Sequence, residues 1–372
     1  MIPLARPLLD SEESDAILRV LESGWLVQGE RVANFEQLLT DRLGIKHVIA
    51  CSSGTAALQL AVAALDLPEG SKVAVPSYTF PSPINVTLLA GHRPVLVDVD
   101  PSTCNLDEED LKQTLDDHPD LRAIIAVHQF GLPAPLPTLM PVFRQRDIAV
   151  VEDAACALGS FLKIGDEWVP AGAVGSMGCF SFHPRKVITT AEGGALSTAD
   201  DDLAARVTSL RDHGRGTDPE TGALEFQRAG WNLRLSEIHA AIGEVQMGRL
   251  DRLLQDRARI AAGYNERLAP LEARGLGLPR VPEDVRPNWQ TYVIRLPKHL
   301  DVPTALARLA EQGIHAGIGA AALHRQPAYR QWADHPLPGT DQCHDSIVAL
   351  PMPPGLSDPE LDQVGEALAR LV

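Results

Sequence analysis

Residues 179–198 read CFSFHPRKVITTAEGGALST, a stretch with one lysine, Lys186, between two short apolar runs. The runs Phe180 to Phe182 and Gly193 to Leu196 predict the end of one strand and the start of the next. The residues between them predict a loop at the edge of a buried sheet. Burial there would lower the pKa of the Lys186 amine and make it a nucleophile. The alternative is an ordinary surface lysine, because buried lysines are rare.

A second stretch, HVIACSSGTAALQLAVAALDL at residues 47–67, predicts a strand, a turn of small residues and a helix. The free N–H groups at the start of a helix bind anions. Gly54 would let the backbone approach a ligand closely, and Thr55 would add a hydroxyl group. A plain helix cap is the alternative interpretation of this turn.

Strand and helix patterns alternate between residues 73 and 152. Such alternation predicts an α/β fold with a mostly parallel sheet covered by helices. Ligands of these folds bind beyond the carboxyl ends of the strands. The features predicted to lie at this edge are Thr55, Phe80, His128, Asp153 and the loop that bears Lys186.

Asp153 directly follows IAVVE, an apolar strand pattern at residues 148–152. A carboxylate at the end of a buried strand is costly unless a cation pairs with it. Asp153 is therefore predicted either to cap the helical segment that follows or to pair with a positively charged nitrogen of a ligand.

A long helical pattern between about Ser236 and Leu268, which has an apolar face, indicates the domain organisation. Beyond it the composition changes to short strands and helices. We expect residues 1–250 to form a large domain that includes the N-terminal helices, and residues 251–372 to form a smaller α+β domain. The polar residues 215–224 predict a turn-rich loop.

The composition excludes several classes of protein. Hydrophobic residues make up 45% and charged residues 22% of the 372 residues, and the net charge is −16, which argues against nonspecific nucleic-acid binding. No stretch resembles a membrane span or a signal peptide. The five cysteines form no CxxC pair, so we expect neither a metal site nor a disulfide framework. We expect a cytoplasmic protein without a membrane partner.

The predicted sheet edge combines an anion site, an aromatic ring, a buried carboxylate and a lysine. This combination is what pyridoxal 5′-phosphate requires for its phosphate, its ring face, its ring nitrogen and its aldehyde. The sequence also resembles the DegT/DnrJ/StrS family of nucleotide-sugar aminotransferases, which have the aspartate-aminotransferase-like fold of pyridoxal-phosphate type I enzymes. The matching segments run almost from end to end and include SSGTAALQLAVAAL, VPSYTFPSPIN, VEDAACALGS, FSFHPRKVITTAEGGALST and GWNLRLSEIHAAIGEVQ.

The resemblance implies roles for the residues that bind the cofactor. Lys186 would bond covalently to the aldehyde and shuttle protons, and Asp153 would pair with the ring nitrogen. Phe80 would stack on the ring, with Tyr78 as the alternative. The residues implied to hold the phosphate are Gly54, Thr55 and Ser181.

The resemblance also implies a homodimer with shared active sites, because Asn232 would reach the phosphate of the neighbouring subunit's cofactor. Arg185, Arg234 and His324 are candidates for substrate contacts. The family usually has Gln or His where this chain has Cys156, a position that contacts the cofactor ring.

Two further departures concern the lysine loop. Arg185 replaces a usual Thr immediately before the lysine, and Ala191 replaces a common Gly. A guanidinium at Arg185 would favour the neutral amine of Lys186 or would bind a substrate phosphate.

The implied reaction moves an amino group from an amino acid, glutamate, to the keto group of a nucleotide-linked sugar. Such a reaction would serve the biosynthesis of amino sugars, polysaccharides or glycosides. A sugar dehydratase of the same family is the nearest rival, but those enzymes carry His at the position of Lys186. The sequence is also compatible with an aminotransferase that acts on a cyclitol, and with a regulatory protein whose cofactor site has decayed.

Overall fold

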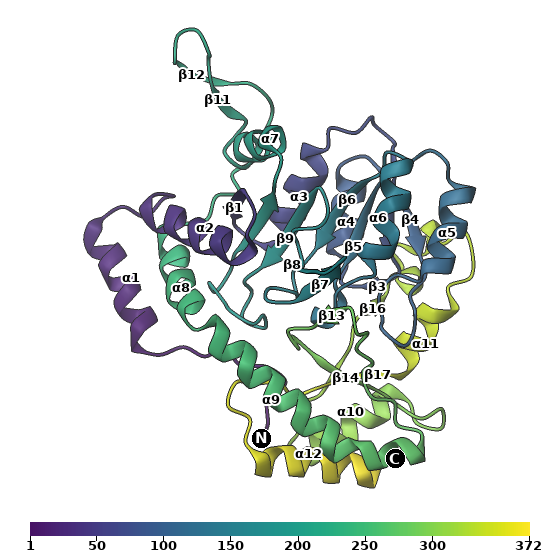
Figure 1. Ribbon diagram of the computed structural model, residues 1–372. Helices are drawn as coiled ribbons and strands as arrows, with labels where there is room; N and C mark the ends of the chain where they lie inside the picture. Colours follow the sequence, from purple (N-terminus) through teal and green to yellow (C-terminus); the bar gives the residue numbers. More distant parts are fainter.

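A seven-stranded sheet forms the centre of the computed structural model, which describes residues 1–372 (Figure 1). Its strand order is β1-β10-β9-β6-β5-β2-β4. Only β10 runs opposite to the other strands, because it pairs antiparallel with both β9 and β1. The predicted mostly parallel sheet is therefore confirmed. The strands are β1 (His47–Cys51), β2 (Lys72–Pro76), β4 (Arg93–Val97), β5 (Leu121–Val127), β6 (Ala149–Asp153), β9 (Met177–Ser181) and β10 (Gly194–Thr198).

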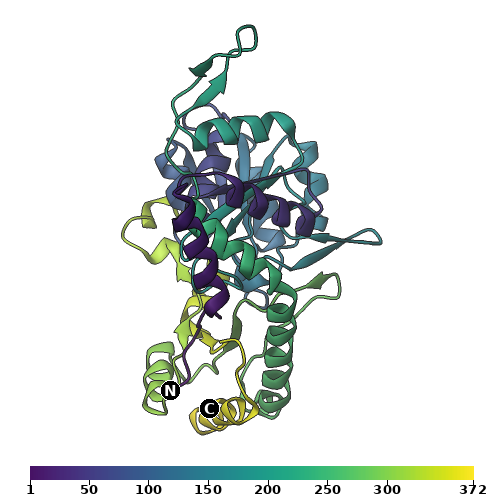
Figure 2. The ribbon, with the colours of Figure 1, turned by 90° about the vertical axis from the view of Figure 1, so that its left-hand side faces the viewer.

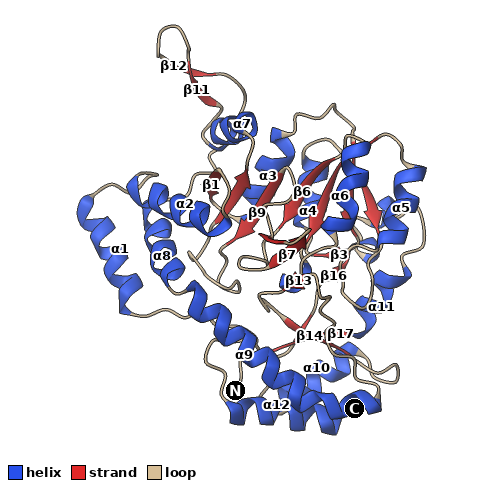
Figure 3. Ribbon diagram, in the orientation of Figure 1, coloured by secondary structure: helices blue, strands red, loops and turns tan.

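Helices cover both faces of this sheet (Figure 3). Neighbouring residues of one strand, such as Val150 and Val151, belong to the cores on opposite faces. Successive side chains of a strand point to opposite faces, so a sheet covered on both sides needs continuous apolar runs. One core includes α2 (Glu30–Leu43), α5 (Glu108–Asp117), α6 (Leu136–Gln145) and α8 (Glu237–Gly248); the other includes α3 (Gly54–Ala64), α4 (Ser82–Leu89) and α7 (Asp201–Arg211).

The long helix predicted from Ser236 to Leu268 is wrong in one respect, because two helices, α8 and α9 (Leu250–Leu268), meet at Arg249. Arg249 follows Gly248, and glycine destabilises the interior of a helix because it loses more conformational entropy than any other residue. The break directs the Arg249 guanidinium toward the start of α1 (Ser11–Ser23), where it pairs with the carboxylates of Asp10, Glu12 and Glu13.

A separate hydrophobic core holds the smaller α+β unit. Ile2 joins this core and pairs with Ile314, so the first residues of the chain contribute to the smaller unit. Both termini lie in this part of the molecule (Figure 2). Its elements are α9, α10 (Val302–Glu311), α12 (Asp358–Leu371), η2 (Ala269–Arg274), β14 (Tyr292–Arg295), β15 (Gly317–Ile318) and β17 (Ile347–Leu350).

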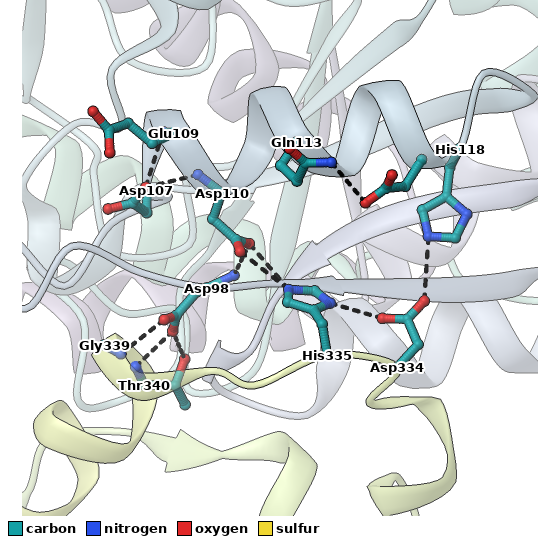
Figure 4. Close-up of polar contacts among 11 residues, drawn as sticks. Asp98, Asp107, Glu109, Asp110, Gln113, His118, Asp334, His335, Gly339 and Thr340 are labelled. Atoms are coloured by element: carbon teal, nitrogen blue, oxygen red, sulfur yellow. Dashed lines mark hydrogen bonds and ion pairs between the residues drawn. The ribbon is translucent and has the colours of Figure 1, made fainter.

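Residues 321–346 return from the smaller unit to the large sheet. β16 (Ala321–Ala322) pairs with β3 (Tyr78–Thr79), and Leu323 lies in the core beside α3. The start of α11 (Pro338–Ser346) binds the carboxylate of Asp98 beyond β4 (Figure 4). Contacts therefore cross the predicted division at residue 250, and the division itself stays a prediction.

A hairpin of β11 (Arg215–Thr217) and β12 (Leu224–Phe226) projects from the molecule where a turn-rich loop was predicted (Figure 1). No helix of the structure is long and apolar enough to span a bilayer. The remaining elements are β7 (Phe161–Ile164), β8 (Glu167–Pro170), β13 (Val285–Arg286), η1 (Gln129–Gly131), η3 (Leu323–Arg325) and η4 (Arg330–Trp332).

Candidate active site

Asp153, the last residue of β6, carries a buried carboxylate that is only partly satisfied. Its side chain accepts one hydrogen bond, at 3.0 Å from the N–H of Ala155, and forms no ion pair within the chain. Burial raises the pKa of Asp153, and the Ala155 hydrogen bond and the charge of Lys186 only partly offset that effect. A carboxylate in this condition has unused capacity for a cationic ligand group.

Lys186 lies half-buried on the loop between β9 and β10. Its Nζ is 3.1 Å from Sγ of Cys156, on the loop after β6. Backbone hydrogen bonds close the lysine loop, with Phe182 bonded to both Gly193 and Thr190 at 2.9 Å. The structure therefore places Lys186 beside Cys156 at the carboxyl end of β6, the edge of the sheet where the sequence predicted the lysine loop.

The start of α3 forms a cradle with the end of β9. A Cβ atom placed on Gly54 would lie 2.7 Å from Cβ of Ser181, so the glycine permits this close approach. Oγ1 of Thr55 lies 2.8 Å from Oγ of Ser82, a hydroxyl group that was not predicted from the sequence. The first turn of α3 carries no acidic side chain. Ser53 caps the helix as the alternative interpretation predicted, because its Oγ accepts the N–H of Ala56 at 3.1 Å. The N–H groups before Ala56 and the neighbouring hydroxyl groups suit a phosphate.

Phe80 lies between β3 and α4, two residues before Ser82, and is 68% exposed. Tyr78, the alternative stacking residue, is buried, and its hydroxyl accepts a hydrogen bond from the N–H of Ala320 at 3.1 Å. Burial raises the pKa of Tyr78. Only Phe80 of the two therefore offers a free aromatic face, and its stacking role stays a prediction.

Asn232 and Arg234 lie on the segment before α8, where Arg234 pairs through the backbone with Cys51 at the end of β1. Arg234 forms an ion pair with Asp212, and exposed Asn232 pairs with Asp212 through the backbone. A surface hollow beside them is lined by Trp25 and Val27 among other residues. No hydrogen bond or ion pair joins either residue to Lys186 in the same chain. Their roles toward a neighbouring subunit's cofactor stay predictions.

The two remaining substrate candidates differ in how free they are. Both ring nitrogens of His324 have partners in the chain, Ser77 Oγ at 3.0 Å and Asp341 Oδ1 at 3.0 Å. A substrate would have to displace one of these partners. The side chain of Arg185 is exposed and makes no hydrogen bond or ion pair within the chain. Arg185 is therefore the better placed of the two to meet an anionic substrate.

His128, predicted at the sheet edge, is fully buried and bonded at both ring nitrogens. Its Nδ1 accepts the N–H of Ala134, so its Nε2 carries the proton and donates to Glu152 at 2.8 Å. Burial opposes ionisation of Glu152, but the hydrogen bond from His128 and the backbone N–H donors of Gly175 and Gly172 outweigh it and lower the pKa of Glu152. This pair supports β6 from within the core.

Asn288 and Gln290, which were not predicted from the sequence, contact the loops of Cys156 and Lys186. The signal that could have found them was the polar run PNWQT at residues 287–291, directly before an apolar strand. Two amides in such a position are candidates for buried hydrogen bonds.

The residues present fit pyridoxal phosphate. The carboxylate of Asp153 has no cationic partner and could pair with the ring nitrogen. The cradle at Gly54 has room for the phosphate, and a larger residue at this position would fill it. The profile of the DegT/DnrJ/EryC1/StrS aminotransferase family matches residues 7–369.

The chain belongs to this family.

Similar proteins agree with this assignment over the full length of the chain. GDP-perosamine synthase from Caulobacter vibrioides is 35% identical over 374 residues, covering 100% of this chain and 98% of that protein. The crystal structure of a DegT DnrJ EryC1 StrS aminotransferase from Brucella abortus is 32% identical with a TM-score of 0.88, covering 97% of this chain and 95% of that one. Spr1654 from Streptococcus pneumoniae, solved in its PMP form, is 25% identical with a TM-score of 0.91, covering 100% and 99% of the two chains.

This DegT-family enzyme is thus a pyridoxal-phosphate-dependent aminotransferase with the type I fold. The predicted family, fold, cofactor and reaction type are confirmed. The individual site residues remain predictions that the geometry accommodates.

Proposed function

We propose that this enzyme transfers an amino group from glutamate to the keto group of a sugar linked to a nucleoside diphosphate. The placement of the Lys186 loop against the carboxyl end of β6, where Asp153 lacks a cationic partner, carries the proposal. A guanosine diphosphate sugar is the first candidate, since GDP-perosamine synthase resembles this chain over its whole length.

The reacting groups have distinct tasks. When bound, pyridoxal phosphate supplies a ring that accepts electrons from the substrate carbon. Asp153 would hold a proton on the ring nitrogen. Nζ of Lys186 would bond to the aldehyde and, once the amino donor has displaced it, would move a proton to and from the α-carbon of the substrate.

The binding groups hold anions. The N–H groups at Gly54 and the hydroxyl groups of Thr55 and Ser181 would bind the cofactor phosphate. The unpaired guanidinium of Arg185 would meet the diphosphate of the sugar nucleotide. A local cation is needed, because the whole chain carries a net charge of −16.

The active unit is a homodimer in this proposal. Trp25 and Val27 are 60% and 58% exposed and line the same hollow as Arg234, and Trp231 is also exposed. Apolar side chains gathered in this way mark contact surfaces. A second copy would cover them and receive Asn232 at its cofactor phosphate. We place the enzyme in the cytoplasm, where a reducing environment suits its five free cysteines.

The proposal is tested with the purified enzyme, pyridoxal phosphate, glutamate and a panel of keto-sugars. GDP-linked and UDP-linked keto-sugars and a cyclitol ketone are compared by product mass. We expect amination of a nucleotide-linked sugar and no covalent cofactor in Lys186→Ala. Turnover by that variant would overturn the assignment of Lys186, and amination of the cyclitol alone would overturn the substrate class.

The shared site is tested with mixed dimers. An Asn232→Ala subunit paired with a Lys186→Ala subunit contains one intact site, so we expect the mixture to recover activity that neither variant has alone. No recovery in dimers that are shown to be mixed would count against a contribution of Asn232 to its neighbour.

A further inference from the structure

The segment 287–291, PNWQT, lies between α9 and β14 and contacts both loops that frame the lysine. Asn288 is 3% and Gln290 is 8% exposed, so both amides are buried, and Oε1 of Gln290 is the one amide atom of the two side chains without a hydrogen-bond partner. Buried amides require hydrogen-bond partners, and the partners show what the segment holds in place.

Gln290 contacts the peptide group next to the lysine. Its Nε2 donates to the carbonyl oxygen of Arg185 at 2.5 Å. That carbonyl oxygen can only accept, so the amide nitrogen must face it. The carbonyl group belongs to the same peptide unit as the N–H of Lys186. The N–H of Lys186 donates to the carbonyl oxygen of His183 at 2.8 Å, so Gln290 holds the carbonyl end of the peptide plane from which the lysine side chain leaves the backbone.

Asn288 holds the opposite side of the lysine contact. Its Nδ2 donates to the carbonyl oxygens of Cys156 and Leu158, each at 2.9 Å, and its Oδ1 accepts the N–H of Gln290 at 2.8 Å. Sγ of Cys156 is the atom that faces Nζ of Lys186. One short segment thus sets both partners of this contact.

The segment keeps this position despite a strained backbone. Trp289 has a φ of 55°, in the left-handed region that non-glycine residues disfavour. Arg257 of α9 donates to the carbonyl oxygens of Trp289 at 3.2 Å and Gln290 at 3.1 Å. Arg257 is 3% exposed and has no carboxylate partner, and burial lowers its pKa to about 10.

The segment also fits its position only because residue 131 is a glycine. A Cβ atom on Gly131 would lie 2.0 Å from Oδ1 of Asn288, and Gly131 has a φ of 88°. Strain and an unpaired buried charge persist where the surroundings over-determine a conformation, and such places cluster at functional sites.

We propose that Gln290 is a positioning residue for Lys186. Its amide orients the Arg185–Lys186 peptide and so directs the lysine Nζ toward the cofactor aldehyde and the substrate α-carbon. This inference rests on the proposed role of Lys186. Loss of the amide leaves the lysine chemically intact but poorly aimed, and an error of about 1 Å in such an alignment reduces turnover by about 100-fold.

The test compares Gln290→Ala and Gln290→Met with a matched control, Gln113→Ala. Gln113 is an exposed glutamine of α5 that donates to Asp117, far from the lysine loop. We expect both Gln290 variants to lose about 10- to 100-fold in kcat, with each KM within about threefold of wild type. The rate at which cofactor-free protein bonds covalently to added pyridoxal phosphate should fall in parallel. Gln113→Ala should match wild type in every measurement.

Thermal unfolding of the cofactor-free variants separates positioning from folding. Gln290→Met keeps the volume of the side chain. If Gln290→Ala proves to be unfolded, the kinetics of Gln290→Met decide the question. A kcat and a bonding rate within twofold of the control would overturn the inference. The Lys186→Ala variant distinguishes the two hypotheses: if it turns over, the proposed role of Lys186 fails, whereas an inactive Lys186→Ala beside an unaffected Gln290→Met removes only the role of Gln290.

Discussion

Asp98 directly follows β4 and Asp153 ends β6, so both lie at the same edge of the sheet, and each is 6% exposed. Asp98 accepts three hydrogen bonds, from the N–H of Gly339 at 2.7 Å and from the N–H and hydroxyl groups of Thr340 at 2.6 and 2.7 Å (Figure 4). Asp153 accepts one. Equal burial with unequal satisfaction separates Asp98, whose carboxylate is satisfied by residues of the chain, from Asp153, whose carboxylate has unused capacity and is proposed to bind the cofactor.

The surroundings of the two carboxylates differ less than their hydrogen bonding does. Asp98 anchors the start of α11 and with it the return segment 321–346. Left-handed backbone occurs on both sides, at Ala191 (φ 68°) and Trp289 (φ 55°) beside the lysine and at Cys104 (φ 60°) beside α11, so strain alone does not separate the two regions. What separates them is the hydrogen bonding of the carboxylates, because functional sites commonly retain groups that are unsatisfied within the chain.

Asp153→Asn should give the largest effect. We expect turnover to fall by at least about 100-fold, because a neutral amide cannot hold the ring nitrogen in its protonated form. The stability of the cofactor-free protein should not fall, because the substitution removes a buried charge without a partner. Steady-state kinetics and urea unfolding of the cofactor-free protein measure the two quantities.

The pH dependence of unfolding sharpens this expectation. The native pKa of Asp153 is raised by burial, so the native state binds the proton more tightly than the unfolded state. The stability of the cofactor-free wild type, measured relative to Asp153→Asn, should therefore fall as the pH rises from the ordinary pKa of Asp through the raised native value. A stability loss in Asp153→Asn as large as that of an Asp98 variant would erase the distinction between the two residues.

In contrast to Asp153→Asn, Asp98→Ala should reduce the stability of the protein. Removing this carboxylate leaves buried donors of Gly339 and Thr340 unpaired, and we expect the free energy of unfolding to fall by about 3 kcal/mol. Urea titration measures this loss. The control is Asp107→Ala, which removes a partly exposed cap of α5 and should cost about 1 kcal/mol. Equal losses in the two variants would show that the return segment does not depend on Asp98.

His335 provides a smaller, pH-dependent test of the contact between the return segment 321–346 and the large sheet (Figure 4). Its Nδ1 lies 2.8 Å from Asp334, and its Nε2 lies 3.1 Å from Asp110 of α5. Burial alone would lower the pKa of His335, but the hydrogen bonds and charges of Asp334 and Asp110 raise it. The charged imidazolium therefore stabilises the fold fully below the ordinary His pKa, and this stabilisation is lost as the pH rises through the raised value.

We expect His335→Gln to be less stable than wild type at about pH 6, below the ordinary His pKa, and to approach it as the pH rises through the native pKa of His335. Urea unfolding across this pH range measures the difference. A constant difference would mean that His335 contributes by packing rather than by charge. The carboxylate of Asp334 also pairs with His118. A parallel series of unfolding measurements on His118→Gln therefore shows which imidazole causes the pH dependence.

Ala191→Gly should have the smallest effect, and it should raise the stability of the protein rather than lower it. The left-handed backbone at Ala191 suits glycine, so we expect the substitution to stabilise the enzyme by about 1 kcal/mol. Thermal unfolding measures the gain. Turnover should stay within twofold of wild type if the strain is incidental. A marked loss of turnover would show that the restricted backbone helps to hold the lysine loop.

The strand and helix patterns predicted most of the large sheet, including the ends of β6 and β9 that carry Asp153 and Ser181. They did not predict that β10 would run antiparallel, because local periodicity does not encode the direction of a strand. The continuous helix predicted through Arg249 is interrupted after Gly248, a residue that disfavours a helix interior. The apolar pattern did not predict that the Arg249 guanidinium would pair there with Asp10, Glu12 and Glu13.

The sequence alone determined the chemistry available to this enzyme. Lys186, Asp153 and the turn at Gly54 occur in a local pattern that is strong enough to identify the family, because each follows or precedes a buried strand. The tertiary structure alone decided which buried groups are satisfied within the chain. Asp98 and Asp153 lie at the carboxyl ends of similar strands, and contacts with residues 339 and 340 distinguish them. Gln290 reaches the Lys186 loop across more than one hundred positions of the chain. Hydrogen-bond satisfaction depends on such distant partners, which no local pattern contains.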